Sequence, residues 1–518
     1  MLRNDTASEF LKPALKNLLE VYLKIMESID SEELIGALEE IVEKFSEDIG
    51  PFAVQLCQQL AAKYQAMVTE DNGDDDDGEE ERALAAAGCV TAMRRIIEAI
   101  NKDKAGLASI LPIIYPILMH CLTPDGLDSI DDGLDCTNIF IYYACDRESR
   151  VPVELWKLLP QMMYITGGND DDVDGGFAFE QLPAVISCLQ NFVAKDPQTF
   201  LSVGEGQTET YFELTVKFIR RILVINAQSV HKEDGVNTLR SLIAIFENLP
   251  GQIDQAMPML VGMLLAEIKI AFDEGSSCPK NYQSMLMQTI AMALFNNNVL
   301  TLSIVEQEGQ TVPLFSTWLT YMPKFKLEFE IRRIVFGLLA ILRVPAGQLP
   351  PVVQQQLPQI VQHLGRLGDV VYKERVKNLE DNEKYVREGF NSDGDDEELD
   401  DDADESNPSA YEDMKKAMKS GKPIDDDDVS DDGDEDYEEN AGEYCLYDSP
   451  LEETDELITI KETLDQIHQA DQSAFQYITS TQTEEERTKM LEVLGKAEEL
   501  KQREKACSEA FKANETAK

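Results

Sequence analysis

Apolar residues recur every three or four positions through the first 390 residues, a spacing that predicts a nearly continuous series of amphipathic helices. The expected helices begin near Thr6, Ser31, Pro51, Leu107, Leu127, Pro152, Phe177, Glu209, Val236, Ile253, Tyr282, Val312, Leu327 and Gln348. Alternation of apolar and polar residues between Asn-Gly or Asp-Gly turns, which would indicate strands, does not recur. The pattern therefore predicts an all-α fold.

Five apolar helices share a Leu-Pro or Met-Pro pair near their expected start. The prolines are Pro112, Pro160, Pro183, Pro258 and Pro358. Proline is tolerated in the first turn of a helix because its missing N–H would have no partner there. We expect all five to lie just before or within a first helical turn.

Helix pairs of roughly 40 to 50 residues, joined by short turns rich in Asp, Gly, Asn and Pro, are typical of a HEAT-type α-solenoid. Each pair leaves an apolar face that the next pair covers. An irregular all-α globule is the alternative interpretation. The spacing favours the solenoid over residues 1–390.

The composition changes sharply at about residue 390. Between Asp393 and Glu439, 23 of 47 residues are Asp or Glu, against four Lys and no Arg. Such a segment repels itself and has little apolar surface to bury, so we predict that 391–445 is disordered. Helical spacing returns after Tyr447 and predicts a C-terminal helical hairpin within 446–518, from Asp455 to His468 and from Thr483 to Lys501.

A second acidic stretch interrupts the helical region. Glu70 to Glu81 contains nine acidic residues out of twelve, and we expect a solvated loop between helices at 70–82. The whole chain has 98 acidic and 46 basic residues, a formal net charge of −52. This charge disfavours general binding to nucleic acid or to an anionic membrane and favours basic protein partners.

Residues that would indicate catalysis or a cofactor are missing from the sequence. It contains neither a phosphate-binding glycine loop, nor a G-x-S-x-G nucleophile motif, nor an H-E-x-x-H zinc motif, and its four His are scattered. We therefore predict that the protein is not an enzyme and has no cofactor and no metal site. A partial calcium-loop pattern starts at Asp170, but Gln181 stands where a bidentate Glu is required, so an ordinary acidic turn is the favoured interpretation.

Cysteine usage and hydropathy bear on the compartment. The nine Cys form no C-x-x-C pair, which favours free thiols and a reducing compartment. No signal peptide is expected at the start, and the longest apolar run, Ala256 to Ala266, is too short to span a bilayer. A methionine stripe, comprising Met257, Met259, Met263, Met285, Met287 and Met292, indicates either solenoid core or an adaptable binding groove, and core is favoured.

Several stretches resemble the importin-7/importin-8 type of nuclear transport receptor in the importin-β superfamily. The stretches are Trp156 to Pro160, Ser284 to Phe295, Thr317 to Leu319, Arg332 to Leu338 and Tyr447 to Leu451. The order of the parts is also similar: helix pairs, an acidic region and terminal helices. The resemblance is to the C-terminal half of such a receptor.

The resemblance implies import of basic cargo, such as ribosomal proteins or histones, through the nuclear pore under control of the GTPase Ran. It also implies binding to FG nucleoporins and a location in cytoplasm, nucleus and nuclear envelope. The candidate cargo-binding residues are Asp74, Asp75, Asp76, Asp77, Glu79, Glu80, Glu81, Asp425, Asp426, Asp427 and Asp428. They match that role physically, because acid runs can replace nucleic acid as the polyanionic partner of a basic protein.

The sequence departs from this family in one respect. The N-terminal repeats, where the superfamily binds Ran-GTP and much of the FG repeats, are not recognisable. A fragment, an incomplete gene model and a paralogue that lacks these repeats all fit this departure. An acidic HEAT-repeat scaffold or chaperone for basic proteins, without a transport cycle, is the alternative function.

Overall fold

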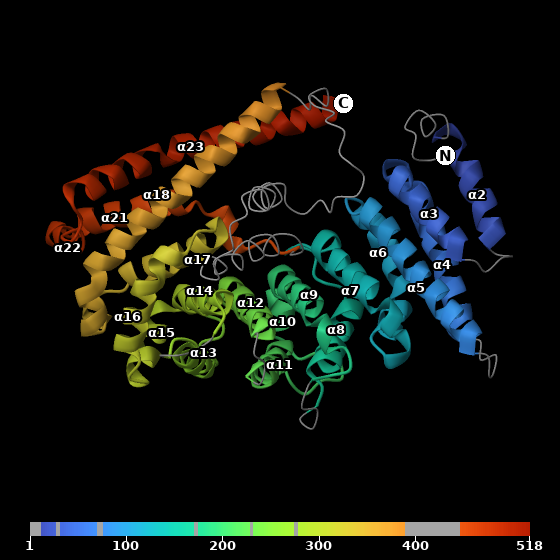
Figure 1. The fold of residues 1–518 in the computed structure, drawn as a ribbon, viewed down its shortest axis with the longest axis horizontal. Coiled ribbons are helices and arrows are strands. Elements are labelled where there is room, and N and C mark those ends of the chain that lie inside the picture. The colour runs from blue at the N-terminus through green and yellow to red at the C-terminus, as the bar shows by residue number, and fades with distance from the viewer. Residues whose placement is uncertain are drawn as a thin grey trace, which may run out of the picture. The chain divides into compact units, whose positions relative to one another are not determined.

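The computed structural model describes residues 12–26, 32–69, 76–169, 175–227, 232–273, 278–388 and 446–517 (Figure 1). These residues form two compact units. Unit 1 comprises Met1–Gln310 together with Leu446–Glu453, and unit 2 comprises Thr311–Cys445 together with Thr454–Lys518. The predicted acidic disordered region, 391–445, lies outside the described residues.

Unit 1 is built of antiparallel helices in two layers. Its α-helices are α2 (Leu15–Met26), α3 (Glu32–Lys44), α4 (Ala53–Thr69), α5 (Asp76–Ala99), α6 (Lys104–Cys121), α7 (Ile130–Ile139), α8 (Val153–Gly167), α9 (Leu182–Lys195), α10 (Pro197–Phe200), α11 (Tyr211–Asn226), α12 (Glu233–Asn248), α13 (Met257–Ala271), α14 (Lys280–Asn296) and α15 (Asn298–Gln307). In one layer α5, α7, α9, α12 and α14 each contact the next, and in the other α4, α6, α8 and α11 do so. This is the predicted HEAT-type solenoid, and the all-α fold is confirmed: the described residues contain no strand, only one isolated bridge between Val203 and Thr210.

Apolar packing between the layers holds unit 1 together. Helix α9 shows the pattern, because its buried Val185, Leu189 and Phe192 follow helical spacing. Each fully buried side chain of this size contributes about 1.5–3 kcal/mol relative to an exposed one. The ring of Trp156 on α8 lies 4.6 Å from that of Phe192 and 4.6 Å from that of Tyr211 on α11. One aromatic cluster therefore joins three helices of neighbouring repeats.

Unit 2 contains α16 (Thr311–Tyr321), α17 (Glu328–Leu342), α18 (Pro351–Glu388), α21 (Glu456–Ala470), α22 (Gln472–Ile478) and α23 (Glu484–Ala517). The predicted C-terminal hairpin is confirmed as α21 and α23, with the short α22 between them. Helices α18 and α23 run in parallel, since Arg366 pairs with Glu486, Asp369 with Lys489 and Glu383 with Arg503, each separated by 120 positions. The α23 start has a capping box in which Thr483 and Glu486 satisfy each other's backbone N–H.

Three of the five prolines lie deeper in their helices than predicted. Pro183 and Pro258 do occupy first turns, but Pro112, Pro160 and Pro358 lie inside α6, α8 and α18. These helices begin earlier than the prolines suggested. In α6 the cause is Asp103, whose carboxylate accepts bonds from two backbone N–H groups and caps the helix nine residues before Pro112.

The acidic stretch at 70–82 also differs from the expected loop. Helix α5 begins at Asp76, so the second half of the stretch forms its first turns. Acidic residues are favoured near a helix N-terminus, where the partial positive charge of the backbone N–H groups stabilises carboxylates. Residues 70–75 lie outside the described part of the chain.

One described helix, α6, is long and apolar enough to cross a membrane by length and composition. In this structure it packs against α4, α7 and α8. Its buried residues include Leu107, Ile110, Ile114 and Leu118. Seven of its 18 residues are buried in this packing.

Candidate binding surfaces

The predicted cargo-binding acids lie largely outside the described residues. Asp74 and Asp75 precede the start of α5, and Asp425–Asp428 fall within 389–445. Asp76, Asp77 and Glu79 to Glu81 belong to the first turns of α5, where the structure describes their backbone. Cargo contact by these residues therefore stays a prediction.

A described acidic cluster lies between α5 and α7, in the same layer. Arg94 Nε lies 2.5 Å from Asp132 Oδ1 and 3.8 Å from Asp135 Oδ2, and Arg94 Nη1 lies 2.6 Å from Glu98 Oε1. Burial raises the pKa of the Asp135 carboxyl, and the neighbouring carboxylates raise it further while Arg94 opposes them. Arg95 also pairs with Glu98, at 3.4 Å, so the cluster holds two guanidinium groups and three carboxylates.

Four consecutive helices of this layer each carry a buried asparagine near their C-terminal end. They are Asn138 on α7, Asn191 on α9, Asn248 on α12 and Asn296 on α14. Asn191 Nδ2 donates to Asn138 Oδ1 at 2.8 Å, and Asn296 Nδ2 donates to the carbonyls of Phe246 and Leu249, both at 2.9 Å. We call this row the asparagine ladder.

Residues 446–453, which we call the strap, lie on this ladder. Asn191 Nδ2 donates to the carbonyl oxygen of Leu446, and Asn248 Nδ2 donates to the Tyr447 hydroxyl at 2.9 Å. The strap is thus bound to unit 1 by side chains more than 190 positions away in sequence.

Charged groups and one apolar anchor complete the strap's attachment. Glu247 Oε2 accepts bonds from the Tyr447 hydroxyl at 2.7 Å and the Ser449 hydroxyl at 2.9 Å. Asp448 accepts from the Tyr142 hydroxyl at 2.7 Å and pairs with Lys195 at 3.5 Å. Leu451 is buried. Burial and the nearby Asp448 carboxylate raise the pKa of Tyr142, so its hydroxyl remains a donor.

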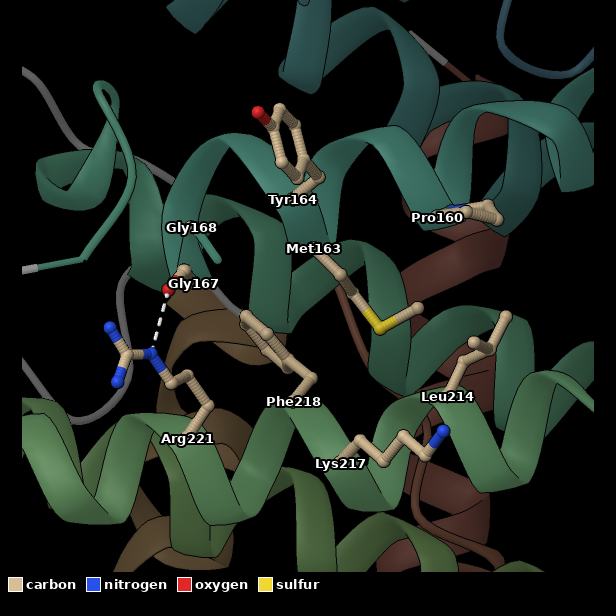
Figure 2. Close-up of a pocket in the computed structure, with 9 residues that line it drawn as sticks. All are labelled: Pro160, Met163, Tyr164, Gly167, Gly168, Leu214, Lys217, Phe218 and Arg221. Carbon is tan, nitrogen blue, oxygen red and sulfur yellow. Dashed lines mark hydrogen bonds between the residues drawn. The ribbon is translucent and has the colours of Figure 1, made fainter. Parts of the chain in front are cut away.

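A separate cavity of about 230 Å³ opens between α8 and α11 (Figure 2). It is lined by Pro160, Met163, Tyr164, Gly167, Gly168, Leu214, Lys217, Phe218 and Arg221. Met163, Leu214 and Phe218 make its apolar wall, and Arg221 Nε donates to the Gly167 carbonyl at 3.3 Å at one end. A Cβ at Gly167 would lie 3.0 Å from the Phe218 ring, so glycine permits this close approach of the helices. The cavity suits an apolar or aromatic side chain.

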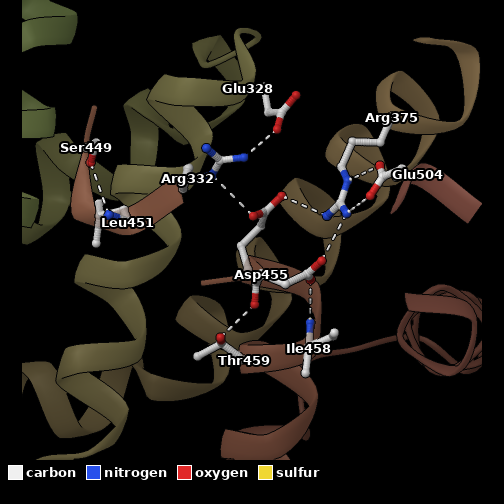
Figure 3. Close-up of polar contacts among 10 residues, drawn as sticks. Glu328, Arg332, Arg375, Ser449, Leu451, Asp455, Ile458, Thr459 and Glu504 are labelled. Carbon is white, nitrogen blue, oxygen red and sulfur yellow. Dashed lines mark hydrogen bonds and ion pairs between the residues drawn. The ribbon is translucent and has the colours of Figure 1, made fainter. Parts of the chain in front are cut away.

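Unit 2 contains a buried ion-pair network (Figure 3). Arg375 on α18 pairs with Asp455 at 3.0 Å, with Glu456 at 3.3 Å and with Glu504 on α23 at 2.5 Å. Arg332 on α17 adds contacts to Glu456 at 3.3 Å and to Glu328 at 2.5 Å. The Glu456 side chain is 1% exposed, so the two arginines hold a carboxylate that has lost its water.

No metal-binding cluster is found among the described residues. They contain no group of three or more His, Cys, Asp or Glu that could hold a metal ion. His120 is half-buried, and its Nδ1 bonds the Tyr64 hydroxyl at 2.8 Å. Burial raises the pKa of the Cys57 and Cys121 thiols to about 12, which leaves them unreactive at neutral pH.

The methionine stripe is mostly core, as the sequence favoured. Met257, Met285, Met287 and Met292 are buried, whereas Met259 is exposed. The four buried methionines therefore belong to the core around α13 and α14.

Comparison with known proteins points to one group of transport receptors. The chain is 27% identical over 375 residues to the importin beta-like SAD2 homolog of Arabidopsis thaliana. The alignment covers 71% of this chain and 34% of that protein. It is 22% identical over 343 residues to a probable importin-7 homolog of Dictyostelium discoideum, covering 66% of this chain and 30% of that protein. It is 21% identical over 423 residues to importin-8 of Danio rerio, covering 78% of this chain and 38% of that protein.

The matches are long but partial. No protein-family profile matches the chain. The chain spans about a third of the length of these curated relatives. The predicted resemblance is nevertheless confirmed: over about 70% of its length the chain is similar to members of the importin-β family of nuclear transport receptors.

Proposed function

We propose that this chain is the cargo-holding part of a karyopherin-type nuclear import receptor for basic proteins. The observation that carries the proposal is the combination of a HEAT-type solenoid, similar to importins over most of the chain, with an acidic segment of 23 carboxylates in 47 residues. Basic proteins such as ribosomal proteins or histones need such a polyanionic partner when they are away from nucleic acid.

The described acidic cluster on α5 and α7 supports this proposal. It lies toward the C-terminal end of α5, whose N-terminal turns carry five of the predicted cargo-binding acids. Contacts of this kind are screened by salt over about 8 Å at physiological ionic strength. Cargo binding would therefore be strongly salt-dependent.

A titration of Ran-GTP into a preformed complex of this chain with a fluorescently labelled basic ribosomal protein, followed by fluorescence anisotropy, tests whether the chain carries the transport switch. Ran-GDP serves as the control. Release by Ran-GTP alone would mean that the chain carries enough of the receptor for Ran control and would exclude the chaperone. Cargo that stays bound while Ran-GTP is in excess would contradict Ran control by this chain and would leave a cargo-holding part of a receptor or an acidic chaperone without a transport cycle.

The cavity between α8 and α11 is our candidate site for FG nucleoporins, because its apolar wall fits the phenylalanine of an FG repeat. Replacing the half-buried Leu214 with Glu is expected to weaken binding of an FG-repeat peptide roughly tenfold, since a charge in an apolar wall disfavours the ring. Binding is measured by anisotropy of the labelled peptide.

A matched control is available on the same helix. Val224 is 57% exposed and does not line the cavity, so Val224→Glu adds the same charge to α11 without touching the site. Equal weakening by both substitutions would show a general charge effect and would overturn the assignment of the cavity.

A further inference from the structure

The strap contains an unusual sequence at the centre of its contacts. Ser449 precedes Pro450, and this is the only Ser-Pro pair among the 518 residues; Thr123-Pro124 is the only Thr-Pro pair. Residues 446–449 have no regular secondary structure, and a short 3-10 helix begins at Pro450. A serine before proline in an irregular segment is the substrate chemistry of a proline-directed protein kinase.

We propose that Ser449 is a phosphorylation site for a proline-directed kinase and that its phosphorylation releases the strap from the asparagine ladder. In the reaction the Ser449 Oγ attacks the γ-phosphorus of ATP, and the bond from that phosphorus to the bridging oxygen of ADP breaks. ADP leaves, and the hydroxyl proton passes to the kinase's base. The product is a phosphoserine that carries about −1.5 to −2 charges at pH 7.

The surroundings of Ser449 oppose that charge. Its Oγ lies 2.9 Å from Oε2 of Glu247, whose residue is 3% exposed. Phosphorylation removes the hydroxyl hydrogen donated to Glu247 and places a dianion beside its carboxylate. The Ser449 Oγ also accepts a hydrogen bond from the Leu451 N–H at 3.2 Å (Figure 3). The phosphate group on Oγ disturbs this bond. Asp448, Glu452 and Glu453 add negative charge on the strap itself.

Two cations near the strap could instead bind the phosphate and hold the strap more tightly. Lys195 lies over the Tyr142 ring at 4.4 Å from its centroid and pairs with Asp448, and Arg147 Nη2 donates to Asn248 Oδ1 at 3.0 Å. If either captured the phosphate, the strap would bind more tightly. Both cations already hold partners in this structure, whereas the Ser449 hydroxyl lies against the Glu247 carboxylate, so release is the expected direction.

Release would uncover the side chains that now hold the strap. Asn191, Lys195, Glu247 and Asn248 would become available on the α9 and α12 faces.

The test is hydrogen exchange on the full chain. The chain carries Thr123→Val, which removes the Thr-Pro pair as a second target. It is incubated with a proline-directed kinase and ATP, and phosphorylation of Ser449 is verified by mass. Hydrogen exchange of peptides covering 446–453 is then measured. We expect exchange of these amides to become roughly tenfold faster or more after phosphorylation. Ser449→Ala, which loses two hydrogen bonds without adding charge, should speed the exchange less than phosphorylation does.

Two results would overturn the proposal. One is a phosphorylated chain in which 446–453 exchanges as slowly as, or more slowly than, in the unmodified chain. The other is a kinase that modifies a synthetic peptide of residues 444–455 but leaves Ser449 of the folded chain unmodified. An unchanged helical circular dichroism signal excludes general unfolding as the cause of faster exchange.

Discussion

Replacing Arg375 with Met is expected to lower the free energy of unfolding of unit 2 by about 3–5 kcal/mol. Met retains most of the apolar stem of Arg375 and removes its charge, so the loss reports the ion pairs rather than packing. Asp455 and Glu456, which are 5% and 1% exposed, would be left with a buried excess of negative charge that Arg332 alone does not balance.

The chain offers a clean reporter for this measurement. It contains two Trp, of which Trp156 lies in unit 1 and Trp318 in α16 of unit 2, and both are buried. In a Trp156→Phe background, urea unfolding followed by Trp fluorescence therefore reports unit 2 alone. Arg503→Met is the matched control: Arg503 also joins α18 to α23, but its side chain is 44% exposed, so its pair with Glu383 contributes little to stability. Similar losses for the two variants would contradict a special role for the buried network.

The second large effect concerns the acidic segment. Deleting Asp393 to Glu439 is expected to weaken binding of a basic ribosomal protein by about tenfold or more at low salt and to flatten the dependence of affinity on salt. The helical circular dichroism signal should persist, because the described helices lie outside the deletion. Isothermal titration at several salt concentrations measures both effects.

A second variant separates charge from length. Replacing every Asp by Asn and every Glu by Gln between 393 and 439 keeps the length of the segment and removes its 23 carboxylates. We expect it to behave like the deletion. A neutralised chain that binds as well as the unchanged chain would refute the electrostatic explanation.

Helical periodicity was sufficient to predict the fold because each repeat buries a local stripe of apolar residues. The starts of α9, α11 and α17 lie within a few residues of the expected positions. The proline positions predicted the wrong helix start where an N-cap residue earlier in the chain fixes it, as Asp103 does for α6. Periodicity also missed α15, because Asn297 ends one helix and caps the next without a break in the apolar pattern.

The binding surfaces were harder to predict, because they depend on residues far apart in sequence. The asparagine ladder has a signal of its own, since Asn138, Asn191, Asn248 and Asn296 recur at intervals close to the repeat length. The strap was expected to be ordered near Tyr447, but its partner Glu247 lies 200 positions away, and no local pattern connects the two. The buried network around Arg375 joins helices whose contact depends on the parallel packing of α18 and α23, which a sequence pattern does not reveal.

Binding of one basic protein in two charge states tests the central claim most directly. A labelled ribosomal protein and the same protein with its lysines acetylated are titrated with the intact chain at physiological salt, and anisotropy gives the two dissociation constants. If the chain holds basic cargo through its carboxylates, the unmodified protein binds tightly, the acetylated one binds much more weakly, and added salt reduces the difference. Equal affinity for the two proteins, or no binding of the unmodified one, would contradict the account.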